Sequence, residues 1–182
     1  MNKLTYCGIG SRQTPTHVLV LMEAIAEELS QRGWILRSGH ADGADQAFER
    51  GAAKHAPYSE IFLPWYGYNN GREGCINVQG LDRWVEARNV AAQFHPAWHR
   101  YSTGGQLLHT RNVFQFGGIQ LDKPSDCVIC WTPKGEITGG TGGALRIAQY
   151  LEIPVFNLGD ADMNAVLDKL AEFVEEREKA NQ

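Results

Sequence analysis

Three glycine-rich segments carry the small and polar side chains that commonly surround a bound phosphate. They are Gly8–Thr14, Ser38–Asp45 and Thr138–Gly143, and each follows an apolar run and precedes a helix-like pattern. Glycine lets the backbone approach an anion closely, and a helix that starts after such a turn presents unpaired N–H groups and a partial positive charge. Three such turns in one chain therefore predict an anion site.

The polar residues of these turns suggest specific contacts. Arg12 offers a planar guanidinium for a phosphate, or is simply a solvated loop charge, and Ser11, Ser38 and Thr141 offer hydroxyl donors. Asp45 is a candidate acceptor for ribose hydroxyls, although an aspartate in a first helical turn also caps a helix without any ligand. The predicted ligand-binding residues of the turns are Gly10, Ser11, Arg12, Ser38, Gly39, His40, Asp42, Gly43, Asp45, Gly139, Gly140, Thr141, Gly142 and Gly143. His40 either donates to the ligand or only fills space.

The elements around these turns alternate between strand and helix. Buried strands are expected at 4–9, 34–37, 61–63, 126–131 and 153–157. Helices are expected from about 15 to 33, after 45 to about 54, over 106–116, from after 143 to 150 and over 163–177. Alternation of this kind needs crossover connections, which produce a parallel sheet covered by helices on both faces.

We therefore expect an α/β, Rossmann-like doubly wound fold with a mainly parallel sheet of about five or more strands. At 182 residues, the chain 1–182 is expected to be a single domain. In such sheets, ligands bind beyond the carboxyl ends of the strands, which is where the three glycine-rich turns are expected to meet.

An aromatic-rich insertion at about 64–105 interrupts the alternation, because it is too long for a simple crossover. Its aromatic and basic residues are Trp65, Tyr66, Tyr68, Arg72, Trp84, Arg88, Trp98, His99, Arg100 and Tyr101. Such residues can stack on bases along a nucleic acid, close over one nucleobase, or form a small satellite core. Trp65, Tyr66 and Trp98 are the candidates for base stacking.

Composition and residue spacing limit the kinds of partner that the protein is expected to bind. The net charge of −4 gives no general attraction for nucleic acid, and no run is apolar enough to span a membrane, so we expect a cytoplasmic protein with no membrane partner. Cys127 and Cys130 are expected on opposite faces of a strand, which argues against a shared metal. Pro96 makes a helix through His95 and His99 insecure, so no metal and no cofactor are expected.

The turns, taken in order, resemble those of the SLOG superfamily, whose members include DprA-like and Lonely Guy-like Rossmann proteins. Ile9–Arg12 looks like the first phosphate loop of DprA proteins, and Ser38–Asp45 matches their Ser-Gly-x-Ala-x-Gly-x-Asp pattern. Arg111-Asn112 resembles the family's Arg-Asn pair before the fourth strand, and Gly139–Gly143 lies where the family has its last glycine-rich loop. The resemblance covers both ends of the chain but not the insertion.

The resemblance adds Arg111 and Asn112 to the candidate ligand-binding residues, and it implies a homo-oligomer, most simply a dimer. Lonely Guy enzymes carry Pro-Gly-Gly-x-Gly-Thr-x-x-Glu, whose glutamate takes part in glycosidic cleavage. Here the aligned residue is Arg146, which reverses the charge and argues against this hydrolysis, although Glu136 could supply a carboxylate. Arg146 either favours an anionic ligand or is an exposed helix arginine.

The main hypothesis is a protein that binds a nucleotide-derived ligand containing phosphate and ribose, as a sensor or a sequestering protein. Two alternatives remain open: a DprA-like protein that binds single-stranded DNA, and a Lonely Guy-like nucleoside monophosphate phosphoribohydrolase. Fold resemblance alone does not choose among them. The small acidic chain favours a discrete small molecule, and whether the protein is an enzyme stays open.

Overall fold

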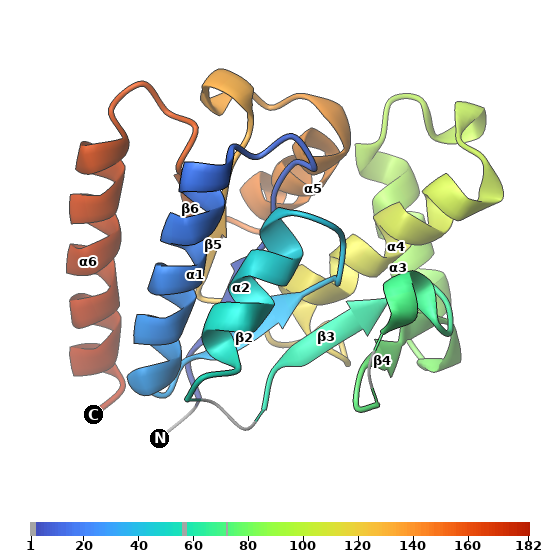
Figure 1. The fold of residues 1–182 in the computed structure, drawn as a ribbon. Helices are drawn as coiled ribbons and strands as arrows, with labels where there is room; N and C mark the ends of the chain where they lie inside the picture. The colour runs from blue at the N-terminus through green and yellow to red at the C-terminus, as the bar shows by residue number, and fades with distance from the viewer. Residues whose placement is uncertain (1–2, 56–57, 72) are drawn as a thin grey trace.

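A computed structural model describes residues 3–55, 58–71 and 73–182, which form a parallel sheet between two layers of helices (Figure 1). The strands are β1 (Thr5–Gly8), β2 (Ile35–Ser38), β3 (Glu60–Leu63), β4 (Ile76–Asn77), β5 (Cys127–Cys130) and β6 (Val155–Asn157). Within the described residues they make a six-stranded sheet in the order β4-β3-β2-β1-β5-β6, and every neighbouring pair is parallel. The α/β doubly wound prediction is confirmed.

The sheet reverses its direction of growth between β1 and β5. The chain builds outward from β1 to β4, then crosses back to place β5 on the other side of β1, where Tyr6 is in register with Cys127. The connections that follow β1 and β5 leave on opposite sides of the sheet, and a crevice opens between them. This is the position where open α/β sheets bind their ligands.

Six α-helices cover the two faces of the sheet within the described residues. They are α1 (Thr16–Gln31), α2 (Ala44–Ala52), α3 (Trp84–Phe94), α4 (Thr103–Gly117), α5 (Gly139–Tyr150) and α6 (Met163–Ala180). Buried residues of α1, α2 and α6 belong to one apolar cluster, and those of α3, α4 and α5 to a second. Among these helices, none is long and apolar enough to cross a lipid bilayer.

The central strands are apolar on both sides, as parallel strands covered by two helical layers must be. In β5, Cys127 faces the cluster of α1, α2 and α6, whereas Cys130 faces the opposite cluster. Both thiols are free, and burial raises the pKa of each. The prediction that these two cysteines lie on opposite faces of the strand is confirmed.

The insertion extends the fold. It contributes the short edge strand β4 and the helix α3, which packs against α4. In the described part of the insertion, the short 3-10 turns are η1 (Tyr68–Asn70), η2 (Val78–Gly80) and η3 (Trp98–Arg100), and η4 (Pro133–Gly135) follows β5. Arg72, one of the basic residues predicted to matter in the insertion, lies outside the described residues.

One predicted boundary is wrong. The last glycine-rich segment was expected to be a loop as far as Gly143, yet α5 already begins at Gly139. A Cβ at Gly142 would lie 2.7 Å from the carbonyl carbon of Ile137, so glycine allows the helix to start in close contact with the preceding chain. The segment is therefore the first turn of a helix, which places its N–H groups at the end of the sheet.

Candidate functional site

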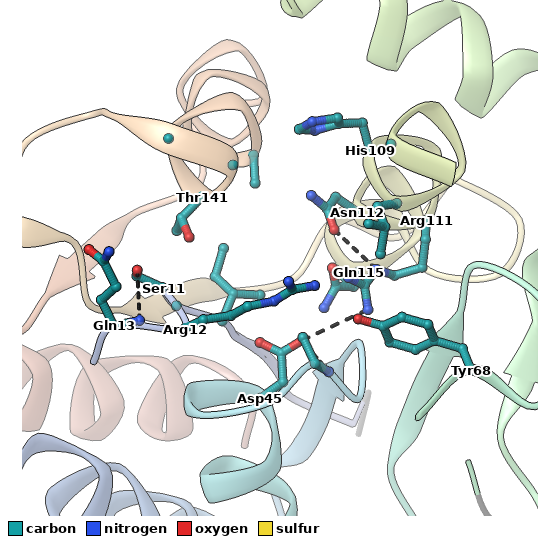
Figure 2. A pocket seen from close by; sticks show the side chains of 18 of the residues that line it. Ser11, Arg12, Gln13, Asp45, Tyr68, His109, Arg111, Asn112, Gln115 and Thr141 are labelled. Carbon is teal, nitrogen blue, oxygen red and sulfur yellow. Dashed lines mark hydrogen bonds and ion pairs between the residues drawn. The ribbon is translucent and has the colours of Figure 1, made fainter. Parts of the chain in front are cut away.

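A cavity of about 530 Å³ lies at the carboxyl ends of β1 and β5, where the turn after β1 meets α2, α4 and α5. Its volume is within the range of roughly 300–1,000 Å³ that is usual for small-molecule sites. The predicted ligand-binding residues that line it are Gly10, Ser11, Arg12, Asp45, Arg111, Asn112, Gly139, Gly140 and Thr141. Residues far apart in the sequence therefore meet at one site (Figure 2).

Arg12 is the exposed cation of this cavity. Its guanidinium extends from the turn after β1 into the middle of the cavity (Figure 2) and forms no hydrogen bond or ion pair with any described residue. The turn itself is well ordered by local bonds, since the Ser11 carbonyl accepts from Thr14 Oγ1 at 2.6 Å and Ser11 Oγ accepts from the Gln13 N–H at 3.1 Å. A fixed turn thus carries a guanidinium with its donors unused.

The N-terminus of α5 forms the wall that faces this turn. Gly140 and Thr141 line the cavity, and the first intrahelical bond runs from the Gly142 N–H to the Thr138 carbonyl at 2.9 Å. The amides before Gly142 have no partner of this kind inside the helix, and no side chain caps them at Thr138. These N–H groups and the helix dipole favour an anion at this end of the cavity.

Arg111 and Asp45 form a buried pair on the other side of the cavity. Arg111 Nη1 lies 3.8 Å from Asp45 Oδ2, and both side chains are almost fully buried. Asp45 also accepts the Ala41 N–H at 3.3 Å, so it organises its own loop while it lines the cavity. Burial raises the pKa of Asp45 to about 6, an effect that Arg111 partly opposes.

Arg111 mainly anchors the neighbouring loop. Its Nη1 donates to the carbonyl of Gly39 and, at 3.4 Å, to that of Phe62, while its Nε donates to Asn112 Oδ1 at 3.0 Å. A Cβ on Gly39 would overlap this guanidinium, which explains why glycine is needed there. The two family-like motifs, Ser38–Asp45 and Arg111-Asn112, are thus physically joined, and the bonds to described residues use Nε and Nη1 of Arg111.

The other predicted residues of the Ser38–Asp45 turn lie outside the lining and shape the turn. Ser38 Oγ donates to the Gly8 carbonyl at 2.7 Å, and Gly43 has a φ of +88°. His40 is buried and its Nδ1 lies 2.7 Å from Glu49 Oε2, so it faces α2 and not the cavity. Of the two open interpretations of His40, the structure favours the one in which it fills space.

Asp42 is also directed away from the cavity. Its Oδ1 accepts hydrogen bonds from Gln46 Nε2 at 3.2 Å and from Asn69 Nδ2 at 3.0 Å. Asn69 Nδ2 also donates to the His40 carbonyl at 3.1 Å. These bonds connect the turn to the insertion, so Asp42 supports the site from outside its lining.

Gly142, Gly143 and Arg146 of the α5 segment do not line the cavity either. Gly143 packs behind the site, where a Cβ would lie 3.2 Å from the ring of His95. Arg146 acts on the same ring, because its charge adds to burial in lowering the pKa of His95. Glu136, the alternative carboxylate for hydrolysis, is exposed and outside the lining.

The predicted base-stacking residues do not form the aromatic wall of the cavity. Trp98 is only 6% exposed and packs in the core cluster of α3, α4 and α5, while Trp65 packs edge-on against Tyr68 with ring centroids 5.0 Å apart. Tyr66 is 89% exposed and lies outside the lining. Trp98 therefore belongs to a hydrophobic core, as one of the interpretations of the insertion proposed, and it is not placed to stack on a base in this cavity.

Other rings line the cavity. Tyr68 and Tyr101 are among the aromatic residues named for the insertion but not among its stacking candidates, and sequence reasoning missed His109. Tyr101 and His109 both line the cavity, with centroids 4.8 Å apart, and His95 packs behind them at 4.4 Å from Tyr101 and 4.3 Å from His109. Burial, together with the charges of His95 and Arg111, lowers the pKa of His109 to about 4. These imidazoles are therefore neutral near pH 7.

Gln115 is a second residue that sequence reasoning missed. Its side chain lies in α4, lines the cavity and is 1% exposed. Its Nε2 is fully buried and finds no hydrogen-bond partner within the described part of the chain. Among those residues there is also no group of three or more histidine, cysteine, aspartate or glutamate side chains that could hold a metal ion.

The comparisons with known proteins support the architecture. No protein-family model matches the sequence, and no curated protein does. The fold is similar to that of the Moco carrier protein of Chlamydomonas rheinhardtii, with a TM-score of 0.53, 15% identity, and coverage of 88% of this chain and 78% of that one.

A second similar structure is that of DNA processing protein A from Helicobacter pylori, described with its single-stranded DNA binding mode. Here the TM-score is 0.48 at 19% identity, covering 91% of this chain and 72% of that one. The parallel sheet and the likeness to the Moco carrier protein confirm the Rossmann-like architecture that the SLOG resemblance implies. At these identities the likeness concerns the fold and leaves the ligand to be argued from the site.

Proposed function

We propose that the cavity binds a phosphate-bearing small molecule of the nucleotide type, and that the protein acts as a sensor or a sequestering protein for it. The observation that carries this proposal is the guanidinium of Arg12, which no described residue pairs and which extends into a cavity that also contains the N-terminus of α5. Both groups stabilise negative charge, and Ser11 and Thr141 add hydroxyls that can donate to phosphate oxygens.

The side of the cavity next to α2 suits a ribose. Asp45 lines the cavity and, although it is paired with Arg111, a carboxylate has lone pairs for further donors. Above its pKa of about 6 it is an acceptor only, which matches the hydroxyls of a sugar. Asp45 lies in the first turn of α2 and lines the cavity, and it makes no side-chain cap bond at the start of that helix.

The geometry favours binding over hydrolysis. Asp45 is the one carboxylate among the described residues that line the cavity, and it is engaged with Arg111. A glycosidic hydrolase commonly needs two carboxylates across the scissile bond. The solved structure with a similar fold is named as a carrier protein of Moco. Binding of a discrete small ligand is therefore compatible with this architecture. The homo-oligomer expected from the resemblance stays a prediction.

Calorimetry tests the proposal with nucleoside mono- and diphosphates, cyclic nucleotides, ADP-ribose and a short single-stranded oligonucleotide. We expect a small ligand to bind, and Arg12→Ala to weaken it about ten- to a hundredfold, because a hydrogen bond to a charged group is worth about 1.5–3 kcal/mol. Arg83→Ala is the matched control, since Arg83 is exposed, outside the lining and paired with Glu86.

Three results would contradict the proposal: no binding of any small molecule, equal binding by the parent and Arg12→Ala, or binding of the oligonucleotide alone. The last result would support the alternative in which the protein handles single-stranded DNA, and salt would then weaken binding steeply.

A further inference from the structure

The amide of Gln115 is a hydrogen-bond donor without a partner at the side of the cavity. Its side chain is 1% exposed, and Nε2 is unpaired among the described residues. Figure 2 shows this side chain between those of Arg12 and Arg111. Buried donors are nearly always satisfied in folded proteins, and an unsatisfied one reduces stability, so this amide calls for a partner that the described residues do not supply.

The backbone of Gln115 is held by a contact that does not involve its side-chain amide. The backbone carbonyl of Gln115 accepts from Ser125 Oγ at 2.9 Å, so the residue is fixed in α4 without its side chain. The neighbouring guanidinium of Arg111 is already committed to the carbonyls of Gly39 and Phe62. On this wall, Gln115 Nε2 is therefore a donor that no described residue uses, whereas Nε and Nη1 of Arg111 are already bonded.

The adjoining wall consists of flat, uncharged rings. His109 and Tyr101 line the cavity with an interplanar angle of 74°, and His95 supports both from behind. Planar side chains of this kind pack well against a planar heterocycle. In Figure 2, Ser11 and Thr141 lie on one side of the view and His109 lies on another, with the Arg12 guanidinium and Gln115 between them. The cavity therefore offers an anion-binding region next to a region for a flat, neutral group.

We propose that Gln115 determines specificity for the base-like part of the ligand: its Nε2 donates a hydrogen bond to an acceptor atom of a neutral planar heterocycle that packs against His109 and Tyr101. This inference rests on the proposed function, because it assumes that the phosphate lies at Arg12. It goes further in that it names a donor for the heterocycle and identifies the rings that contact it.

The test compares ribose 5-phosphate, which has no base, with the monophosphates of adenosine, guanosine, cytidine and uridine, by calorimetry. At least one nucleotide is expected to bind the parent protein at least tenfold more tightly than ribose 5-phosphate. Gln115→Met keeps the length of the side chain and removes the donor, so it should reduce this preference by about tenfold. Gln149→Met, at an exposed position near the end of α5, is the control and should keep the preference.

Thermal unfolding gives a second readout that does not depend on a ligand. Since Gln115→Met removes an unpaired buried donor, its melting temperature should equal or exceed that of the parent. A clear loss of stability would show that the amide has a structural partner and would overturn the inference.

The binding results distinguish a wrong assignment of Gln115 from a failure of the proposed function. If the parent binds ribose 5-phosphate as tightly as every nucleotide, or if Gln115→Met keeps the full preference, the assignment of Gln115 is wrong and the proposed function stands. If neither the sugar phosphate nor any nucleotide binds, the proposed function fails, and this inference fails with it.

Discussion

The guanidinium of Arg111 in α4 lies directly over Gly39 in the turn after β2 and donates Nη1 to the Gly39 carbonyl. This contact joins two segments that are 72 residues apart in the sequence. It holds the turn that carries Asp45 against the helix that carries Gln115, so the two walls of the cavity are fixed relative to each other.

Replacing Gly39 by alanine should disturb this contact, because a Cβ at that position would overlap the guanidinium of Arg111. Overpacking of this kind typically costs about 1–3 kcal/mol of unfolding free energy. Denaturant unfolding measures the loss. Gly80→Ala is the control, since a Cβ at Gly80 would have no described atom within 4 Å, and its effect should stay within about 0.5 kcal/mol. A Gly39→Ala protein as stable as the parent would contradict the contact.

Arg111 and Asp45 should be energetically coupled. Arg111→Met leaves the buried Asp45 carboxylate and the Gly39 carbonyl without their partner, and breaking a buried pair in this way costs about 3–5 kcal/mol. Asp45→Asn in the same background removes the isolated charge and should restore part of the loss. A double-mutant cycle by denaturant unfolding should give a coupling of about 0.5–3 kcal/mol, and simple additivity would show that the pair does not interact.

The sheet and the position of the site could be predicted from local patterns. Strands such as β1 and β5 are buried on both faces and therefore read as continuous apolar runs. The glycine-rich turns follow these strands, and parallel strands bring their carboxyl ends to one edge, so the convergence of Arg12, Asp45 and Thr141 follows from topology.

Other features of the fold and the site could not be predicted from the sequence. The strand β4 has two residues, which is too short for a periodic pattern. The aromatic insertion contains many rings, and their type does not tell which are buried: Trp98 enters the core while Tyr101 reaches the cavity. Gln115 and His109 lie in a helix with polar residues on several sides, so their direction depends on how α4 packs and not on their spacing.

His109 should make stability depend on pH between about 4 and 6.5. Its pKa falls from the ordinary 6.5 to about 4 in the folded protein, so in this range the unfolded chain binds more protons and stability is lost as the pH falls. The slope for this group is at most about 1.4 kcal/mol per pH unit. His109→Gln should remove it, as measured by urea unfolding at several pH values. His95, whose pKa is also lowered, acts in the same direction and remains in the variant.

Asp45 should have the opposite effect in nearly the same range. Its pKa rises from 3.8 to about 6 on folding, so the folded protein binds more protons there and loses stability as the pH rises. The two groups partly cancel in the parent protein. Asp45→Asn should therefore make stability rise more steeply with pH, whereas His109→Gln should make it rise less steeply or fall. If both variants change the slope in the same direction, the two pKa assignments are not both correct.

A substitution at Gly140 should change stability and ligand affinity in opposite directions. It lies in the first turn of α5 and lines the cavity, and a Cβ there would have no described atom within 4 Å. Gly140→Asp replaces a poor helix former and puts a negative charge at the positive end of the helix, which together should raise the unfolding free energy by about 0.5–1 kcal/mol. The same charge would occupy the proposed phosphate position.

We therefore expect Gly140→Asp to be more stable than the parent and to bind the phosphate-bearing ligand at least tenfold more weakly, since like charges within the cavity repel. Gly140→Asn has the same shape without the charge and is the control, with a much smaller loss of affinity. Thermal unfolding and calorimetry on the three proteins give both quantities. Equal affinities for the Asp and Asn variants would place the phosphate away from the N-terminus of α5, because a charge that close to a bound anion cannot leave its affinity unchanged.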